Sequence, residues 1–169
     1  MVRSDVEAFI NDNGERLDEF AEKYGISGTS RAMIRFEAFS RTMGIKALKN
    51  INPYAPLSVT DGLCRWDLNY SGYNVEVKVR YAKYPDDRIS KNKIRCLKDK
   101  NAIICVISID DGTVRCYRAS DFTSTGTWAH KNKTAEEGEW IKDEYVCYQP
   151  VSACWTTTVT ITYGKKGNS

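Results

Sequence analysis

The sequence has a single histidine, His130, and none of its six cysteines belongs to a Cys-x-x-Cys pair. A structural zinc site usually needs four thiolate or imidazole ligands at characteristic spacings, so the sequence argues against one. The cysteines are Cys64, Cys96, Cys105, Cys116, Cys147 and Cys154. Several lie in apolar runs, where a free thiol packs as a small hydrophobic group. We expect reduced thiols, because a chain of 169 residues can bury a core without disulfide support.

Long apolar segments are missing as well. No stretch approaches the roughly 20 apolar residues that span a bilayer. The first residues, MVRSDVEAF, turn acidic at once and lack the apolar centre of a signal peptide. Because hydrophobic residues make up 41% and charged residues 28%, the composition is that of an ordinary globular domain. These features predict a cytoplasmic protein with no membrane partner.

Charge is distributed unevenly along the chain. Residues 1–25 contain seven acids and three bases, a net charge of −4. Residues 78–100 contain nine bases and three acids, a net charge of +6. A basic segment of this kind suits a polyanion such as DNA, although a solvated charged surface gives the same pattern.

Helical signals dominate the first part of the sequence. A capping box of the form Ser-x-x-Glu predicts a helix from Asp5 that is interrupted at Asn13-Gly14 and ends at Gly25. A second helix is predicted over 31–43, with Gly44 as its end. From Cys64 onward, apolar and polar residues alternate with the period of two that is typical of strands. The elements expected there are two strands flanking Ser71-Gly72, a basic helix over 90–98, strands over 102–109, 113–118, 140–148 and 156–163, and a loop over 123–139.

The Ser71-Gly72 pair is a two-residue hairpin signal, and it sets the pairing of the strands on either side. Counting outward places Leu68 opposite Val75 and Asp67 opposite Glu76. The apolar face, which we expect to pack on the core, comprises Cys64, Trp66, Leu68, Tyr70, Tyr73, Val75, Val77 and Val79. The polar face comprises Arg65, Asp67, Asn69, Asn74, Glu76, Lys78 and Arg80.

Two carboxylates therefore face each other, about 5 Å apart at Cβ. Like charges repel in this arrangement, and a divalent cation such as Mg²⁺, which prefers hard oxygen ligands, would neutralise them. Lys78 lies on the same face, next to the expected metal. The alternative is a solvated hairpin in which Lys78 and Arg65 soften the repulsion, but oppositely charged pairs would then be expected across the strands.

Asp67, followed by Glu76-Val77-Lys78 within an apolar strand, resembles the motif of the PD-(D/E)XK nuclease superfamily. This superfamily includes many restriction enzymes and Holliday-junction resolvases, and Cys64-Arg65-Trp66 replaces the proline that often precedes its aspartate. The resemblance implies an α/β (α+β) fold with a restriction-endonuclease-like core, in which helices flank a central mixed β-sheet. Within a single domain of residues 1–169, the expected parts are an N-terminal helical extension (1–29), the core (30–122), and C-terminal strands and a loop (123–169).

By this resemblance the protein is a metal-dependent endonuclease that hydrolyses phosphodiester bonds in DNA with Mg²⁺, for which Mn²⁺ substitutes. Asp67, Glu76 and the backbone carbonyl of Val77 would hold the metal. Lys78 would orient the attacking water or stabilise the developing charge. The residues expected to contact the phosphate backbone are Arg80, Lys83, Arg88, Lys91, Lys93 and Arg95.

Glu37 lies on the helix that precedes the hairpin, where related nucleases often place a glutamate that assists the metal. The competing interpretation is an i,i+4 ion pair between Glu37 and Arg41, worth a few tenths of a kcal/mol. Related enzymes commonly pair to cut both strands, so a homodimer is one expectation, although the residues themselves leave the oligomeric state open.

Two other functions stay open. Residues 20–27, followed by Ile34, resemble a helix-turn-helix, which would make the protein a DNA-binding regulator without catalysis. Arg31, however, stands where that motif usually buries an aliphatic residue. The third interpretation is a nuclease-like fold kept as an interaction or structural module, although nothing requires an inactive site to keep two facing carboxylates and a lysine. The sequence does not decide between duplex, junction, single strand and RNA.

Overall fold

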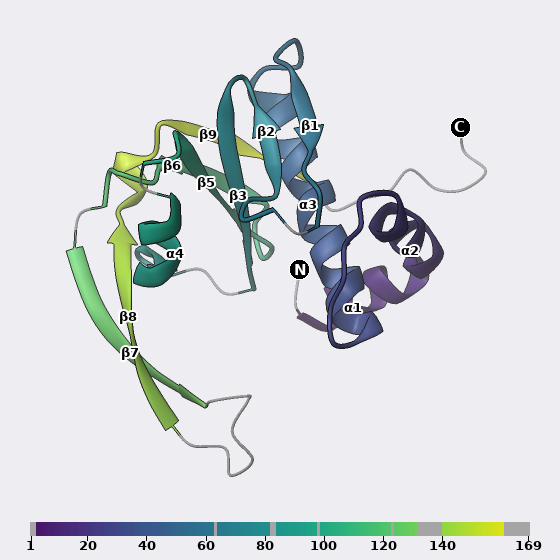
Figure 1. Cartoon of the computed structure of the whole chain (residues 1–169), viewed down its shortest axis with the longest axis horizontal. Coiled ribbons are helices and arrows are strands. Elements are labelled where there is room, and N and C mark those ends of the chain that lie inside the picture. Colours follow the sequence, from purple (N-terminus) through teal and green to yellow (C-terminus); the bar gives the residue numbers. More distant parts are fainter. Residues whose placement is uncertain are drawn as a thin grey trace.

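The computed structural model describes residues 3–62, 64–81, 84–97, 99–122, 124–131 and 140–160 (Figure 1). Its helices are α1 (Arg3–Asp12), α2 (Gly14–Lys23), α3 (Arg31–Ile51) and α4 (Lys91–Leu97), with a short 3₁₀ turn at Pro150–Ser152. Its strands are β1 (Leu57–Val59), β2 (Leu68–Tyr70), β3 (Tyr73–Arg80), β4 (Asp87–Ser90), β5 (Ala102–Ser108), β6 (Thr113–Arg118), β7 (Ser124–Lys131), β8 (Trp140–Tyr148) and β9 (Trp155–Thr158).

A six-stranded sheet forms the centre of the fold, in the order β1-β2-β3-β5-β6-β9. Strands β3 and β5 are parallel and the other neighbours are antiparallel, so the predicted mixed α/β class with a mixed central sheet is confirmed. Parallel neighbours need a crossover connection, and the segment between β3 and β5 contains β4 and α4. Strand β4 belongs to a second, three-stranded sheet in the order β4-β8-β7.

Both faces of the central sheet are covered (Figure 1). Helix α3 packs on one face, with α1 and α2 packed against α3, and α4 packs with β4 and β8 on the other. Strand β5 shows the arrangement directly, because Ile103 and Cys105 belong to the first core and Ile104 and Val106 to the second. A strand buried on both sides reads as a continuous apolar run, which explains why 102–109 lacks alternation.

The predicted break at Asn13-Gly14 is confirmed, since it separates α1 from α2. The predicted end of the second helix at Gly44 is wrong, because α3 continues to Ile51. A Cβ at Gly44 would lie 2.6 Å from Cγ2 of Val77 and 3.1 Å from Cδ1 of Leu68. This glycine therefore lets α3 approach the central sheet closely and does not end the helix.

The Ser71-Gly72 turn is confirmed, with φ values of 48° and 82°. These values suit the two-residue hairpin turn whose twist matches that of its strands. The pairing is also as predicted, with Leu68 opposite Val75. The predicted position of Trp66 is wrong, because this residue packs against the second core. Residues 64–67 are a bend rather than strand, so the alternation of faces does not extend that far.

The loop predicted over 123–139 is partly wrong, since β7 occupies 124–131 and pairs with β8; residues 132–139 lie outside the described residues. Its polar sequence gives little strand signal, but pairing with a neighbour satisfies its backbone. The last predicted strand is confirmed at its start as β9, whereas residues 161–163 of that prediction and the tail beyond them are outside the described part.

All six cysteines are free thiols, and three of them, Cys105, Cys116 and Cys147, are buried. In the described part of the chain, no helix has both the length and the apolar character needed to cross a membrane.

Candidate active site

Asp67 lies directly before β2, in the bend that precedes the strand, and its charge acts on Glu76 of β3. Its backbone N–H donates to the carbonyl of Val75 at 2.9 Å, although Val75 is already the partner of Leu68, so the regular pairing of the hairpin ends there. Its carboxylate Oδ2 accepts a hydrogen bond of 2.8 Å from the backbone N–H of Val77. The carboxylate of Asp67 therefore lies against the edge of β3 at Val77, close to Glu76, while the paired register itself extends only to Leu68 and Val75.

Glu76 is buried, with 5% of its surface exposed. Its Oε1 lies 3.1 Å from Nζ of Lys78 and 3.2 Å from Nζ of Lys93. Burial raises the pKa of the Glu76 carboxyl, and the charge of Asp67 raises it further, while the two lysines act in the opposite direction. The two carboxylates thus interact electrostatically inside the protein.

Arg41, a buried residue of α3, forms an ion pair with Asp67. The sequence did not predict that Arg41 belongs to the site. The Nη2 of Arg41 lies 3.5 Å from Oδ1 of Asp67, and its Nη1 donates to the carbonyl of Thr60 at 3.1 Å. Thr60 in turn donates its N–H to the carbonyl of Asp67. The charged contact of Arg41 is therefore with Asp67. In the sequence, the only feature that drew attention to Arg41 was its position four residues after Glu37.

Glu37 is exposed at the surface of α3, but its carboxyl group interacts electrostatically with the charged residues around Asp67. Desolvation by the surrounding protein raises the pKa of Glu37, and the charge of Asp67 adds to this effect. Arg41, Lys78 and Lys93 oppose it. The structure therefore brings all four residues predicted for catalysis within electrostatic range, with Glu37 at the rim.

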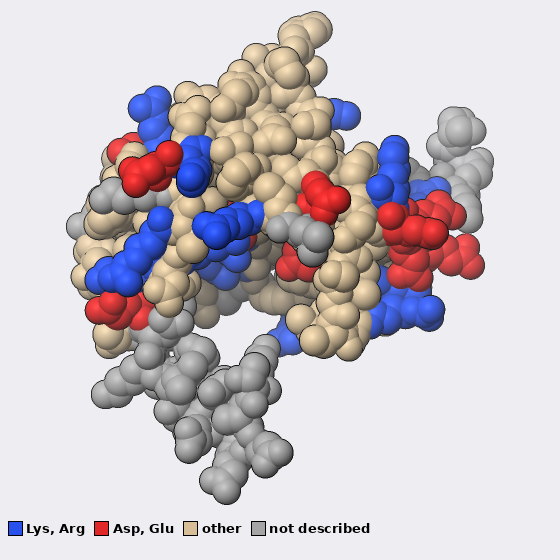
Figure 2. Space-filling view, in the orientation of Figure 1, with Lys and Arg blue, Asp and Glu red and all other residues tan. Residues whose placement is uncertain are grey.

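The predicted phosphate contacts separate into different environments. Lys93 of α4 binds Glu76 and donates to the carbonyl of Arg65 at 2.9 Å, so it belongs to the site itself. Lys91 pairs with Glu144 at 3.1 Å, and Arg95 is exposed on α4. Figure 2 shows several basic side chains on the half of the molecule that carries α4, with some acidic side chains among them, and acids and bases side by side over α2.

Arg80 is the last residue of β3, and Arg88 belongs to β4. Arg80 donates to the carbonyl of Arg88 at 2.6 Å, and burial lowers the pKa of Arg80. Arg88 pairs with Asp86 at 3.0 Å. Both arginines line a pocket of about 410 Å³. Lys83, the remaining predicted contact, lies outside the described residues.

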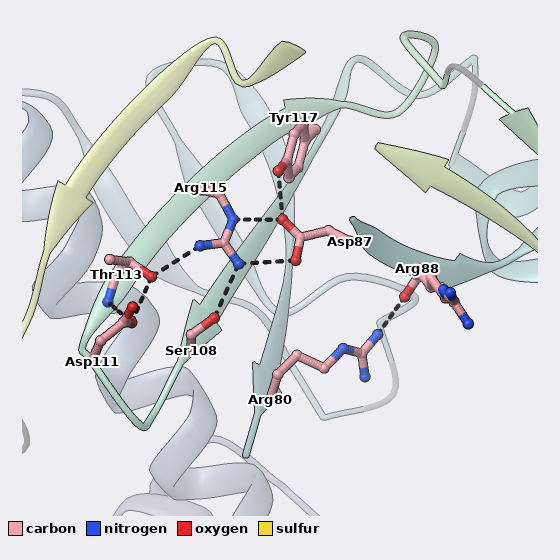
Figure 3. Close-up of polar contacts among 8 residues, drawn as sticks. All are labelled: Arg80, Asp87, Arg88, Ser108, Asp111, Thr113, Arg115 and Tyr117. Atoms are coloured by element: carbon pink, nitrogen blue, oxygen red, sulfur yellow. Dashed lines mark hydrogen bonds and ion pairs between the residues drawn. The ribbon is translucent and has the colours of Figure 1, made fainter. Parts of the chain in front are cut away.

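A buried polar network fixes β4 to the central sheet (Figure 3). Arg115 of β6 binds Asp87 of β4 through two hydrogen bonds, of 2.6 and 3.0 Å, and also donates to Ser108 of β5. The hydroxyl of Tyr117 donates to the same carboxylate. The hydrogen bond to Asp87 raises the pKa of Arg115, so the guanidinium stays charged. Since α4 follows β4 directly, this network positions the helix that carries Lys93.

The sequence analysis missed this network. Its signal was the alternation of Thr113, Arg115 and Tyr117, which puts three polar groups on one face of a strand that is otherwise buried. Nothing in the sequence identified Asp87 as their partner.

The donor atoms of the site fit a hard cation bound by few protein ligands. In the described part of the chain, two buried side-chain atoms have no hydrogen-bond partner, Nε of Arg41 and Oε2 of Glu76, and both lie here. The carbonyl of Val77 faces the same strand edge as its N–H, which binds Asp67. Among the described residues, no three His, Cys, Asp or Glu side chains form a metal-binding group. Mg²⁺, however, typically takes one or two carboxylates and completes its shell with water and phosphate.

Comparison of the chain with family models, with curated proteins and with solved structures finds no match.

Proposed function

We propose that this protein is a Mg²⁺-dependent endonuclease acting on DNA. The observation that carries the proposal is the interacting pair of Asp67 and Glu76, in which one buried oxygen of Glu76 lacks a partner while two lysines reach the other. An unpaired buried carboxylate oxygen is costly unless a ligand satisfies it. A divalent cation at this position would satisfy the oxygen and remove the repulsion between the carboxylates.

The order of elements supports the same proposal. Helix α3 carries Glu37, the β2–β3 hairpin carries Asp67 and Glu76, α4 supplies basic residues, and β5 and β6 complete the sheet. We infer that this is a restriction-endonuclease-like core of the PD-(D/E)XK type.

Each residue of the site has a distinct part in the proposed hydrolysis. Mg²⁺, or Mn²⁺ in its place, would be held by Asp67 and Glu76 and would supply Lewis-acid activation of water and of the scissile phosphate. Asp67, oriented by Arg41 and by the N–H of Val77, and Glu76 are the carboxylate ligands. Lys78 stabilises the charge that develops on the phosphate when the water oxygen bonds to phosphorus and the bond to the leaving oxygen breaks. Glu37, at the rim with a raised pKa, is placed to accept a hydrogen bond from water.

The connection between α2 and α3 favours this proposal over the DNA-binding regulator. A helix-turn-helix joins its helices by three or four residues, whereas residues 24–30 separate α2 from α3. The middle of α3, including Phe39 and Met43, is buried in the first core. The middle of α3 therefore supports the sheet and is not accessible to a major groove.

The test is cleavage of plasmid and branched DNA in Mg²⁺ and in EDTA, by the wild type and by Asp67→Asn, Glu76→Gln and Lys78→Met. We expect Mg²⁺-dependent cleavage that falls by two orders of magnitude or more in each variant. Lys49→Met, at the exposed far end of α3, is the control for a lost surface charge. Cleavage that persists in all three site variants would refute the mechanism.

A folded wild type that neither cleaves DNA nor binds Mg²⁺ or Mn²⁺ in a calorimetric titration would support the non-catalytic module instead. The cytoplasmic location and the homodimer that cuts both strands remain separate proposals, and sedimentation of the protein with and without DNA tests the second.

A further inference from the structure

A pocket of about 730 Å³ adjoins the candidate active site and has no part in the proposed hydrolysis. Its walls come from α1, from the first turns of α3 and from the end of β3, and they include Arg3, Arg31, Met33, Phe36, Glu37 and Tyr81. Because Glu37 belongs both to the pocket and to the group of charges around Asp67, a chain bound at the active site has the pocket beside it. The volume lies within the roughly 300–1,000 Å³ that is typical of small-molecule sites.

Aromatic rings form one wall of this pocket. Phe36 and Tyr81 lie 6.0 Å apart between ring centroids and are inclined by 30°, and both are half-buried. The guanidinium of Arg3 lies over the ring of Tyr81 at 5.1 Å from its centroid. Aromatic and guanidinium planes of this kind stack on unpaired nucleobases without preference for sequence.

The charged groups at the rim suit phosphates. Three arginines line the pocket, Arg3, Arg31 and Arg35, against the acids Glu7 and Glu37. Arg35 is paired with Asp18 at 2.8 Å, and Arg3 with Glu7 at 3.1 Å in an exposed contact. Exposed ion pairs contribute little, so Arg3 can exchange Glu7 for a phosphate at small cost. Arg31 is exposed at the start of α3, where the positive end of the helix dipole adds to its charge.

Tyr81 connects this pocket to the one beyond it. The same residue lines the 410 Å³ pocket that contains Arg80 and Arg88. The two pockets therefore share Tyr81, the residue directly after the strand that carries Glu76 and Lys78. A single strand bound in the first pocket would have the arginines of the second pocket nearby.

We propose that the 730 Å³ pocket binds unpaired nucleotides next to the scissile phosphate, so that the preferred substrate is DNA with a single-stranded tail. This inference rests on the proposed nuclease function and specifies its substrate class. The bases of an intact duplex are stacked on one another and offer no free face to Phe36 or Tyr81. A single-stranded tail offers both its base faces and its phosphates.

The experiment measures binding of the full-length protein in EDTA, where no cleavage occurs, by fluorescence anisotropy. The probes are a blunt DNA duplex, the same duplex with an oligothymidine tail of about six nucleotides at either end, and the tail strand alone. We expect a tailed duplex to bind about tenfold more tightly than the blunt one, as stacking of one or two bases would give. Arg31→Glu should abolish this preference, because it places a negative charge at the pocket rim. Lys49→Glu reverses a charge at the exposed opposite end of the same helix and should retain the preference.

Equal affinity for blunt and tailed duplexes would overturn the inference, as would a tail preference that survives either Arg31→Glu or a folded Phe36→Leu variant. If Phe36→Leu does not fold, because Phe36 is half-buried, the measurement on Arg31→Glu alone still decides the question. Binding in EDTA does not depend on catalysis. A tail preference that requires Arg31, in a protein that cuts no DNA in Mg²⁺, would therefore refute the nuclease and leave the pocket as a single-strand site.

Discussion

Adding Mg²⁺ at about a hundredfold excess over its dissociation constant should raise the melting temperature of this protein by roughly 5–11 °C. A ligand that binds only the folded state stabilises it by about 2.7 kcal/mol at that concentration. For a chain of this size, each kcal/mol corresponds to roughly 2–4 °C. The expected reason is that a bound cation would satisfy the unpaired Oε2 of Glu76 and would remove the repulsion between Glu76 and Asp67.

The shift should also depend on pH. The folded protein raises the pKa of Glu76 above its ordinary value of 4.5, chiefly by burial and then by the charge of Asp67. An acid with a raised folded pKa contributes stability below its unfolded pKa and loses that contribution as the pH rises through the folded pKa. The metal-free protein therefore loses stability from about pH 4.5 upward through this group. The increment given by Mg²⁺ should grow over the same range, because the cation competes with the proton.

Differential scanning fluorimetry or calorimetry from pH 5 to 8, with and without Mg²⁺, measures both effects. Glu76→Gln removes the ligand charge while keeping the shape of the side chain, and it should abolish the shift. Lys49→Met should leave the shift intact. A wild-type melting temperature that does not respond to millimolar Mg²⁺ or Mn²⁺ would refute the reasoning, as would a shift of equal size in Glu76→Gln.

Three further predictions concern packing, the buried network and Lys93. Gly44→Val should destabilise the protein by about 1–3 kcal/mol in urea unfolding, because its Cβ would overlap Val77; an unchanged midpoint would show that α3 can move away from the sheet. Asp87→Ala should cost about 3–5 kcal/mol by leaving Arg115 buried without its partner, and Asp87→Ala combined with Arg115→Met should recover part of this loss in the same assay. Lys93→Met should raise the pKa of Glu76 further and move the acidic limb of the pH–rate profile upward, with rescue by Lys93→Arg. Lys91→Met removes an equal charge from the same helix where it pairs with Glu144, and should leave that limb in place.

Local chemistry made the hairpin predictable. The Ser71-Gly72 turn has a single favoured geometry, and strand alternation then fixes every pair up to Leu68 and Val75. Extending this register by one residue predicts that Asp67 and Glu76 approach each other, and they do, although Asp67 already lies in the bend and is held by the N–H of Val77. The direction of the bend depends on the packing of Trp66 against the second core, which the sequence does not reveal.

The features that escaped prediction depend on contacts between distant parts of the chain. Gly44 has the local signature of a helix end, but its role is set by Val77, a strand residue that sequence reasoning could not place beside it. Arg41 was read as a partner for Glu37 because only neighbours in sequence could be compared. Asp87 and Arg115 lie 28 residues apart. They meet because the chain leaves the central sheet after β3 and β4 then packs over a face of that sheet.

The difference in length between β2 and β3 has a consequence for how this site could be altered. Only Tyr73–Val75 of β3 pair with β2, while β3 continues to Arg80. The edge of β3 that β2 leaves uncovered supplies the N–H of Val77, which donates to the carboxylate of Asp67. Sequence changes that straighten the bend before Asp67 and lengthen β2 would cover that edge with ordinary strand pairing. Such changes would strengthen the sheet but would remove the site. At this position the protein can therefore have either a longer regular strand or the proposed site, but not both.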